Sequence, residues 1–166
     1  MLGSDQTLRF LPTPTLSLTS SPTMPPQSSL VALPSPLPEM EAKHYYRGLP
    51  SSLPLVARSS TTPLEESTVK ELRPVGNYAI KEIWEGSFSL NLFDILDSVK
   101  VQWTSIDLVR IGNIEETFAP VVVWIGVRPA SLSGYDGLDV ASKCKKFLLE
   151  HDIADVDVQI RESLCW

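Results

Sequence analysis

The strongest hydrophobic patterns lie in the second half of the chain, where they predict two strands. Val121–Val127 is a nearly continuous apolar run, typical of a strand that is covered on both faces of a sheet. Val156, Val158 and Ile160 alternate with polar residues, which predicts a half-buried strand with one face in solvent. Both segments are therefore expected to belong to one sheet.

Two other segments repeat their apolar residues with the period of a helix. The first covers about 78–98, where Gly86 either weakens one helix or separates two. The second begins at Asp136 or Gly137 and ends near residue 150. Its apolar stripe consists of Leu138, Ala141, Cys144, Phe147 and Leu148.

Two weaker patterns complete the series of elements. Residues 71–75 are short and extended in type, and an edge strand tolerates Pro74. Residues 101–111 alternate as a strand does, but the alternation slips near Thr104–Ile106, which predicts a bulge or a kink. The predicted order along the chain is therefore β-α-β-β-α-β.

This order is that of a ferredoxin-like fold, so we expect a small α+β sandwich with both helices on one face of the sheet. Its two β-α-β crossovers should be right-handed. If residues 71–75 form no strand, the domain is instead a four-element α/β fragment. A domain of about 90 residues can bury one modest core, so its stability is expected to be marginal.

The first part of the chain has a different composition. Residues 1–70 contain eleven of the fourteen prolines, and each proline removes a backbone donor and restricts the residue before it. We expect residues 1–42 to be a disordered Pro/Ser/Thr-rich arm and 43–70 an extended linker that partly docks. Residues 71–163 then form the small α/β domain. The motif Pro22-Thr-Met-Pro25 fits an SH3 or WW ligand and equally fits a plain spacer.

Within the linker, residues 43–58 differ from what precedes them. Tyr45 and Tyr46 lie together there with three basic side chains. This segment either docks on the domain or on a partner, or its aromatic residues are incidental.

Charge and cysteine content narrow the classes of partner. Residues 71–166 carry fifteen acidic and nine basic side chains, and an acidic domain repels phosphate backbones, so nucleic acid is not an expected partner. No stretch approaches the roughly 20 apolar residues that span a bilayer, and no secretory signal is visible, so no membrane partner is expected. Cys144 and Cys165 form neither a disulfide framework nor a metal motif, which favours a reduced intracellular chain.

Candidate chemistry is sparse, and we expect no catalytic residue, cofactor or metal ligand. His44 and His151 have no nucleophile at a recognisable spacing. The 131–137 loop joins the central strand to a helix, and a Gly/Ser loop in that place can bind an anion through backbone N–H groups. The loop matches no phosphate-binding motif, so it is equally a simple connection. Its candidate ligand-binding residues are Ser131, Ser133, Gly134 and Gly137.

Several strings of residues resemble a family of uncharacterised fungal proteins over about 43–163. They are His44–Pro50, Leu55–Pro63, Glu71–Asn77, Ile80–Glu85, Val109–Gly112 and Trp124–Gly134. Longer members of that family continue into a region that resembles a trypsin-like serine protease and would supply its catalytic residues. The sequence given ends at Trp166, before any such region. The resemblance therefore implies an accessory N-terminal module or a truncated gene product, with residues 1–42 outside the match.

Together these observations predict a non-catalytic interaction or regulatory module, or the truncated N-terminal part of a protease-like protein, and not an enzyme. Its partner would be a protein that the sequence does not identify, and the chain would be a monomer or a weak oligomer. The alternative is a small ligand- or anion-binding α/β domain that uses the 131–137 loop.

Overall fold

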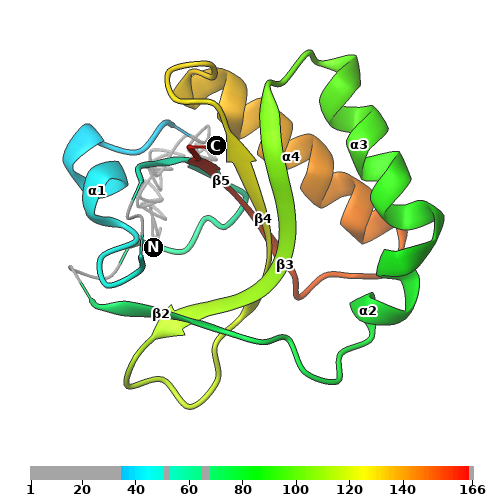
Figure 1. Cartoon of the computed structure of the whole chain (residues 1–166), viewed down its shortest axis with the longest axis horizontal. Coiled ribbons are helices and arrows are strands. Elements are labelled where there is room, and N and C mark those ends of the chain that lie inside the picture. The colour runs from blue at the N-terminus through cyan, green and yellow to red at the C-terminus, as the bar shows by residue number, and fades with distance from the viewer. Residues whose placement is uncertain (1–34, 51–52, 65–67, 165–166) are drawn as a thin grey trace, which may run out of the picture. The chain divides into compact units, whose positions relative to one another are not determined.

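The computed structural model describes residues 35–50, 53–64 and 68–164, and these form one mixed sheet with helices (Figure 1). The strand order is β1-β5-β4-β3-β2. The strands are β1 (Leu55–Arg58), β2 (Lys70–Arg73), β3 (Trp103–Asn113), β4 (Val121–Val127) and β5 (Asp157–Glu162). Of the arm predicted to be disordered over 1–42, residues 1–34 lie outside the described residues, and so does the motif Pro22–Pro25.

The helices are α1 (Glu39–His44), α2 (Ile80–Ile83), the π-helical turn η1 (Trp84–Phe88), α3 (Ser89–Ser98) and α4 (Gly134–Glu150). Gly86 has non-helical backbone angles, φ −93° and ψ −148°, so the predicted break at this glycine is confirmed. The phase slip predicted near Thr104–Ile106 is also confirmed, because the register of β3 on β4 shifts between Trp103 and Ser105. Among the described residues no helix is long and apolar enough to cross a bilayer.

The prediction of a ferredoxin-like sandwich is wrong. That fold needs two parallel β-α-β crossovers, but β2 and β3, which α2 and α3 connect, are antiparallel neighbours. Only β4 and β5 are parallel, with α4 between them in the chain. The 43–70 region also contributes a further strand, β1, which pairs antiparallel with β5. The order of elements along the chain does not determine which strands become neighbours, because several pairings satisfy the same order.

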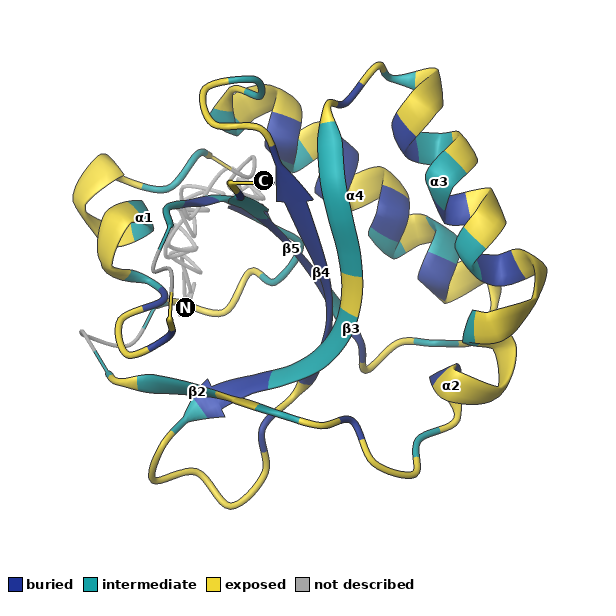
Figure 2. Ribbon diagram, viewed as in Figure 1, coloured by how far each residue is buried: buried dark blue, intermediate teal, exposed yellow. Residues whose placement is uncertain are grey.

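One face of the sheet is covered by α3 and α4, which lie side by side on it (Figure 1). The buried cluster on this face consists of apolar side chains and the thiol of Cys144. Every residue of β4 is buried (Figure 2), which confirms that this strand is covered on both faces. The fully buried residues of this core include Leu92, Leu96, Val123, Ile125, Ala141, Cys144, Leu148, Val158 and Ile160.

The opposite face is covered by the segment around α1. Tyr46 packs there on Val122 and Trp124 in a second buried cluster. β5 differs from the half-buried strand that its alternation predicts, because Gln159 is only 6% exposed. The polar residues of β5 therefore face this second layer of the protein rather than open solvent.

Candidate functional site

A cavity of about 680 Å³ lies over the face of the sheet that the long helices leave uncovered. Its floor is formed by Ile111 of β3, Val122 of β4 and Gln159 of β5. The size falls within the roughly 300–1,000 Å³ that is usual for small-molecule sites. We call this cavity the cleft.

Three segments form the walls of the cleft, and each of them mixes polar with apolar side chains. Such a lining is typical of a site that holds the apolar body of a ligand and orients its polar group. The wall residues are Met40, Glu41, His44 and Tyr45 around α1, then Arg58, Ser60, Thr62, Pro63 and Leu64, and finally Thr68, Lys70, Gly112, Asn113, Glu116 and Pro120.

A chain of hydrogen bonds links the buried layer to the cleft. The Tyr46 hydroxyl donates to Gln159 Oε1 over 2.9 Å, which determines the orientation of the amide. Gln159 Nε2 then donates to the Tyr45 hydroxyl oxygen, also over 2.9 Å. Because this oxygen accepts in the chain, the Tyr45 hydroxyl proton remains available to an acceptor in the cleft.

Burial keeps both tyrosines protonated. It raises the pKa of Tyr46 well above its ordinary value, because a buried phenolate loses its hydration. It also raises the pKa of Tyr45, although the nearby Arg58 guanidinium opposes this shift. At neutral pH the two hydroxyl groups are therefore neutral donors.

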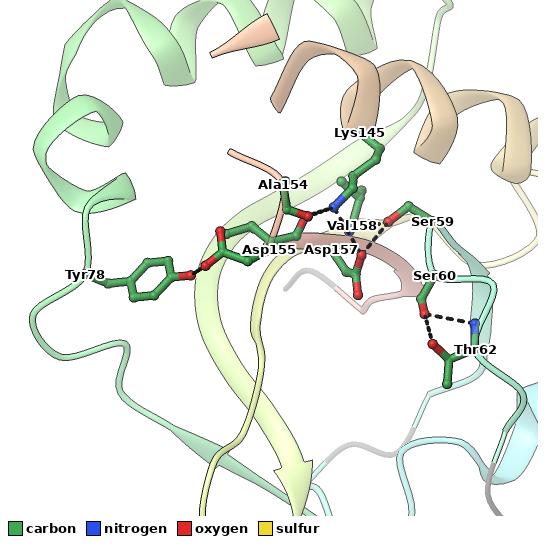
Figure 3. Close-up of polar contacts among 10 residues, drawn as sticks. Ser59, Ser60, Thr62, Tyr78, Lys145, Ala154, Asp155, Asp157 and Val158 are labelled. Carbon is green, nitrogen blue, oxygen red and sulfur yellow. Dashed lines mark hydrogen bonds and ion pairs between the residues drawn. The ribbon is translucent and has the colours of Figure 1, made fainter. Parts of the chain in front are cut away.

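The carboxylate of Asp157 at the edge of the cleft has partners of its own. Lys145 Nζ lies 3.3 Å from Asp157 Oδ1 and also donates to the carbonyl oxygens of Ala154 and Val156 over 2.7 and 2.6 Å. Ser59 Oγ contacts the same carboxylate over 3.4 Å. Figure 3 shows these groups converging from α4 and from the end of β1. The negative charge of Asp157 is thus compensated from outside the cleft.

Glu116 is engaged in a similar way. Its carboxylate accepts from the backbone N–H of Asn113 over 3.0 Å and from Asn113 Nδ2 over 2.9 Å. These bonds close the turn after β3 and direct the acid towards its own loop. The acidic groups at this side of the cleft therefore serve the fold.

The two basic side chains of the cleft wall, Arg58 and Lys70, have different partners. Arg58 donates to the carbonyl oxygen of Thr62, and none of the ion pairs among the described residues includes it. Lys70 Nζ lies 4.7 Å from the centre of the Tyr45 ring and 3.3 Å from Asn113 Oδ1. Among the groups considered, Arg58 is thus the strongest hydrogen-bond donor that can still act on a ligand in the cleft.

The two serine hydroxyl groups of the 131–137 loop have partners in the turn before α4 and at its start. Ser133 is the N-cap residue: its Oγ accepts from the Asp136 backbone N–H over 3.1 Å and donates to Asp136 Oδ2 over 2.7 Å. Ser131 Oγ donates to the carbonyl oxygen of Arg128 over 2.6 Å. Both hydroxyl groups have partners within the turn, as is usual for a capped helix.

The two glycines of the same loop allow close packing. A Cβ atom on Gly134 would lie 3.0 Å from Pro36, and one on Gly137 would lie 2.9 Å from Val56. The absence of a side chain thus lets β1 and the segment before α1 approach α4. A ligand site in this loop stays a prediction, and the contacts of its four candidate residues are explained by capping and packing.

Sequence reasoning identified part of the cleft and missed the rest. The pair Tyr45 and Tyr46 was visible as an unusual aromatic and basic segment, but Arg58 had no pattern that marked it. The available signal was Gln159, a polar residue between two core residues in a strand whose neighbours leave little open surface.

Among the described residues no group of three or more His, Cys, Asp or Glu side chains could hold a metal ion.

Comparison of the chain with models of protein families, with curated proteins and with solved structures finds no match.

Proposed function

We propose that this protein is a non-catalytic binding module that holds a small amphiphilic anion, such as a carboxylate with an apolar body, in the cleft. The observation that carries the proposal is the pairing of Arg58, which has no carboxylate partner among the described residues, with the Tyr45 hydroxyl proton beside a partly apolar floor. Guanidinium and hydroxyl donors together suit a carboxylate.

The two halves of such a ligand meet different parts of the cleft. Its head group would accept hydrogen bonds from Arg58 and Tyr45, and the positive charge of Lys70 would add a favourable field. Its apolar body would lie on Ile111 and Val122, whose side chains are buried in the floor. Each half adds to the affinity, so neither a purely polar anion nor a neutral hydrocarbon should bind as well.

Binding without turnover is the expected behaviour. Catalysis by a hydroxyl nucleophile needs a base in hydrogen-bond contact with it. No hydrogen bond joins His44 to a hydroxyl group of the described lining residues, and Ser60 Oγ instead bonds to Thr62 Oγ1 over 3.1 Å. The role of an accessory module in a longer, protease-like protein stays a prediction and is compatible with such a site.

Three probes with one apolar tail separate the contributions. Octanoate, octanol and octylamine differ only in the head group, and isothermal titration with amide chemical-shift mapping measures their binding. Octanoate should bind roughly ten-fold or more tightly than octylamine, because a hydrogen bond to a charged group contributes about 1.5–3 kcal/mol. Shifts should centre on the residues of the cleft. Shifts centred on 131–137 would instead favour the loop.

Two variants test the named donors. Arg58→Gln should weaken octanoate binding roughly ten-fold, and Tyr45→Phe should weaken it less, because a neutral donor contributes about 0.5–1.5 kcal/mol. Lys143→Gln is a matched control: it removes the same charge from the exposed face of α4, where Lys143 pairs with Asp139 over 2.6 Å. Equal octanoate binding by Arg58→Gln and Lys143→Gln, or no preference for octanoate over octylamine, would refute the proposal.

A further inference from the structure

One edge of β3 is only partly paired. β3 spans Trp103–Asn113, but β2 pairs with Arg110–Asn113 alone. β2 ends at Arg73. Figure 1 shows β2 beside only the lower end of β3. Among the described residues, the 105–109 part of this edge has no strand beside it.

The alternation of β3 determines which backbone groups face the unpaired edge. The Ile111 N–H donates to the Pro120 carbonyl over 3.2 Å, on the β4 side, and the Ile114 N–H donates to Val69 over 3.1 Å, on the β2 side. From Ser105 onward, after the register shift, odd-numbered residues of β3 therefore point their N–H and C=O groups at β4, and even-numbered residues point theirs away from it. The backbone groups of Ile106 and Leu108 thus face the unpaired edge.

Apolar side chains lie along the same edge on the helix side of the sheet. Ile106 and Leu108 pack against the main core but remain partly exposed. At the start of β3 the Trp103 ring stacks on Phe93 of α3, with centroids 5.2 Å apart and planes at 10°. Leu90 lies three residues before Phe93, on the same side of α3, and is 59% exposed. An added strand would find apolar contacts on this side.

The other side of the edge carries a negative charge. Asp107 is exposed and pairs opposite Trp124 of β4. The Arg161 guanidinium stacks 3.7 Å from the centre of the Trp124 ring and interacts electrostatically with the Asp107 carboxylate. The two groups form no close ion pair, since none of the ion pairs of the described residues includes Asp107. A basic side chain placed opposite Asp107 would complete a cross-strand pair, which is stabilising in sheets.

The same charge disfavours a second copy of the chain. If two β3 edges paired antiparallel with Asp107 at the centre, the two Asp107 carboxylates would lie directly opposite each other. If the register shifted by two residues, the two carboxylates would still be diagonal neighbours and would repel each other. An outward charge of this kind is a common guard against pairing of identical edges. The edge therefore discriminates between partners by charge.

We propose that the unpaired edge of β3 binds an extended segment of a partner protein, which adds as a sixth strand next to Ile106 and Leu108. The segment carries apolar side chains towards α3 and a basic side chain opposite Asp107. The proposal uses the edge of the sheet and not the cleft, so either can fail without the other.

The test uses two synthetic peptides and the full chain. Acetyl-Val-Thr-Val-Lys-Val-Thr-Val-amide has the proposed pattern, and its counterpart with Glu in place of Lys reverses the charge. The Lys peptide should slow hydrogen exchange of the Ile106 and Leu108 amides, measured by NMR, and should bind roughly two- to ten-fold more tightly than the Glu peptide. Exchange at the amides of Asp107, Val109 and Ile111, which face β4, serves as the internal reference.

Variants at Asp107 separate the charge from the backbone pairing. Asp107→Lys should reverse the preference so that the Glu peptide binds more tightly, and Asp107→Asn should remove the preference while both peptides still protect Ile106 and Leu108. Asp139→Lys makes the same charge change on the outer face of α4 and should keep the preference of the original chain. Because Asp107 is exposed, these variants should retain the circular dichroism spectrum of the folded protein.

Two results would overturn the proposal. One is the absence of amide protection at Ile106 and Leu108 by either peptide at millimolar concentration. The other is protection of both amides in the chain without peptide, together with a dimer in sedimentation equilibrium, which would assign the edge to a second copy.

Discussion

The two faces of the sheet are built on different principles. On one face α3 and α4 bury a nearly continuous apolar core in which Leu92, Leu148 and Ile160 are wholly inaccessible. On the other, a short helix and its turns cover the sheet with hydrogen-bonded polar side chains, of which Tyr46 and Gln159 are the most buried. The apolar face gains stability in proportion to buried area. The polar face gains little net energy per hydrogen bond but holds specific groups beside an open cleft.

This difference predicts where the protein tolerates change. Removing volume from the helix face should reduce stability and leave the chemistry of the cleft unaltered. Changing polar groups on the cleft face should cost less stability and affect binding more. The predictions below test this division, beginning with the largest expected effect.

Leu148→Ala on α4 should have the largest effect. The side chain is fully buried, and a cavity left by Leu→Ala in a core costs about 2–5 kcal/mol. Urea unfolding followed by circular dichroism measures the free energy of unfolding. Leu149→Ala is the matched control, because the neighbouring leucine is 49% exposed and should change the free energy by about 0.5 kcal/mol or less. Similar losses for the two variants would contradict the packing described for α4.

Tyr46→Phe should cost less, about 1–3 kcal/mol, because it leaves the buried Gln159 Oε1 without its donor. The ring and its contact with Trp124 remain, so the variant isolates the hydroxyl group. Tyr135→Phe, at a tyrosine that is 75% exposed, controls for the loss of a hydroxyl group as such. If Tyr46→Phe left the free energy of unfolding unchanged, the polar link would not stabilise the cleft face.

Alkaline pH should weaken both faces, through a different group on each. Burial raises the pKa of the Cys144 thiol from 9.0 to about 12 and raises the pKa of Tyr46 above 10.0. A raised folded-state pKa means that the folded protein binds more protons than the unfolded chain above the unfolded pKa. The contribution of these two groups to the free energy of unfolding is therefore fully present below pH 9. It decreases as the pH rises from about 9 through 12, by up to about 1.4 kcal/mol per pH unit for each group.

Variants assign this pH dependence to its sources. Cys144→Ala should remove the part of the slope that begins near pH 9, and Tyr46→Phe should remove part of the slope above pH 10. Urea midpoints measured between pH 8 and 11 show both effects, and each slope is compared with that of the same variant at pH 8. A slope that neither substitution changes would mean that other groups control the alkaline loss.

Elements with strong local patterns could be predicted from the sequence. The run Val121–Val127 gave a strand covered on both sides, and the stripe through Ala141 and Cys144 gave α4, because periodicity records which side of an element is buried. The sheet order could not be predicted in this way. β1 has only four residues, Leu55–Arg58, and its pairing with β5 depends on contacts between distant parts of the chain rather than on any local signal.

The cleft was less accessible to prediction for the same reason. Tyr45 and Gln159 are 114 positions apart in the chain, yet they share a hydrogen bond. Arg58 comes beside them only because β1 pairs with β5. The local composition around Tyr45 showed that the segment was unusual, but a site assembled from three separate segments leaves no spacing that a motif could capture.

The smallest expected effect on stability is that of Arg58→Gln, and this small effect is what distinguishes the cleft from the core. Arg58 is half-buried, bonds to a backbone carbonyl and has no carboxylate partner among the described residues. Its removal should therefore change the free energy of unfolding by about 0.5 kcal/mol or less, while octanoate binding falls. A loss of stability as large as that of Tyr46→Phe would instead identify Arg58 as part of the structural layer, and the cleft would lose its main candidate for recognition of an anion.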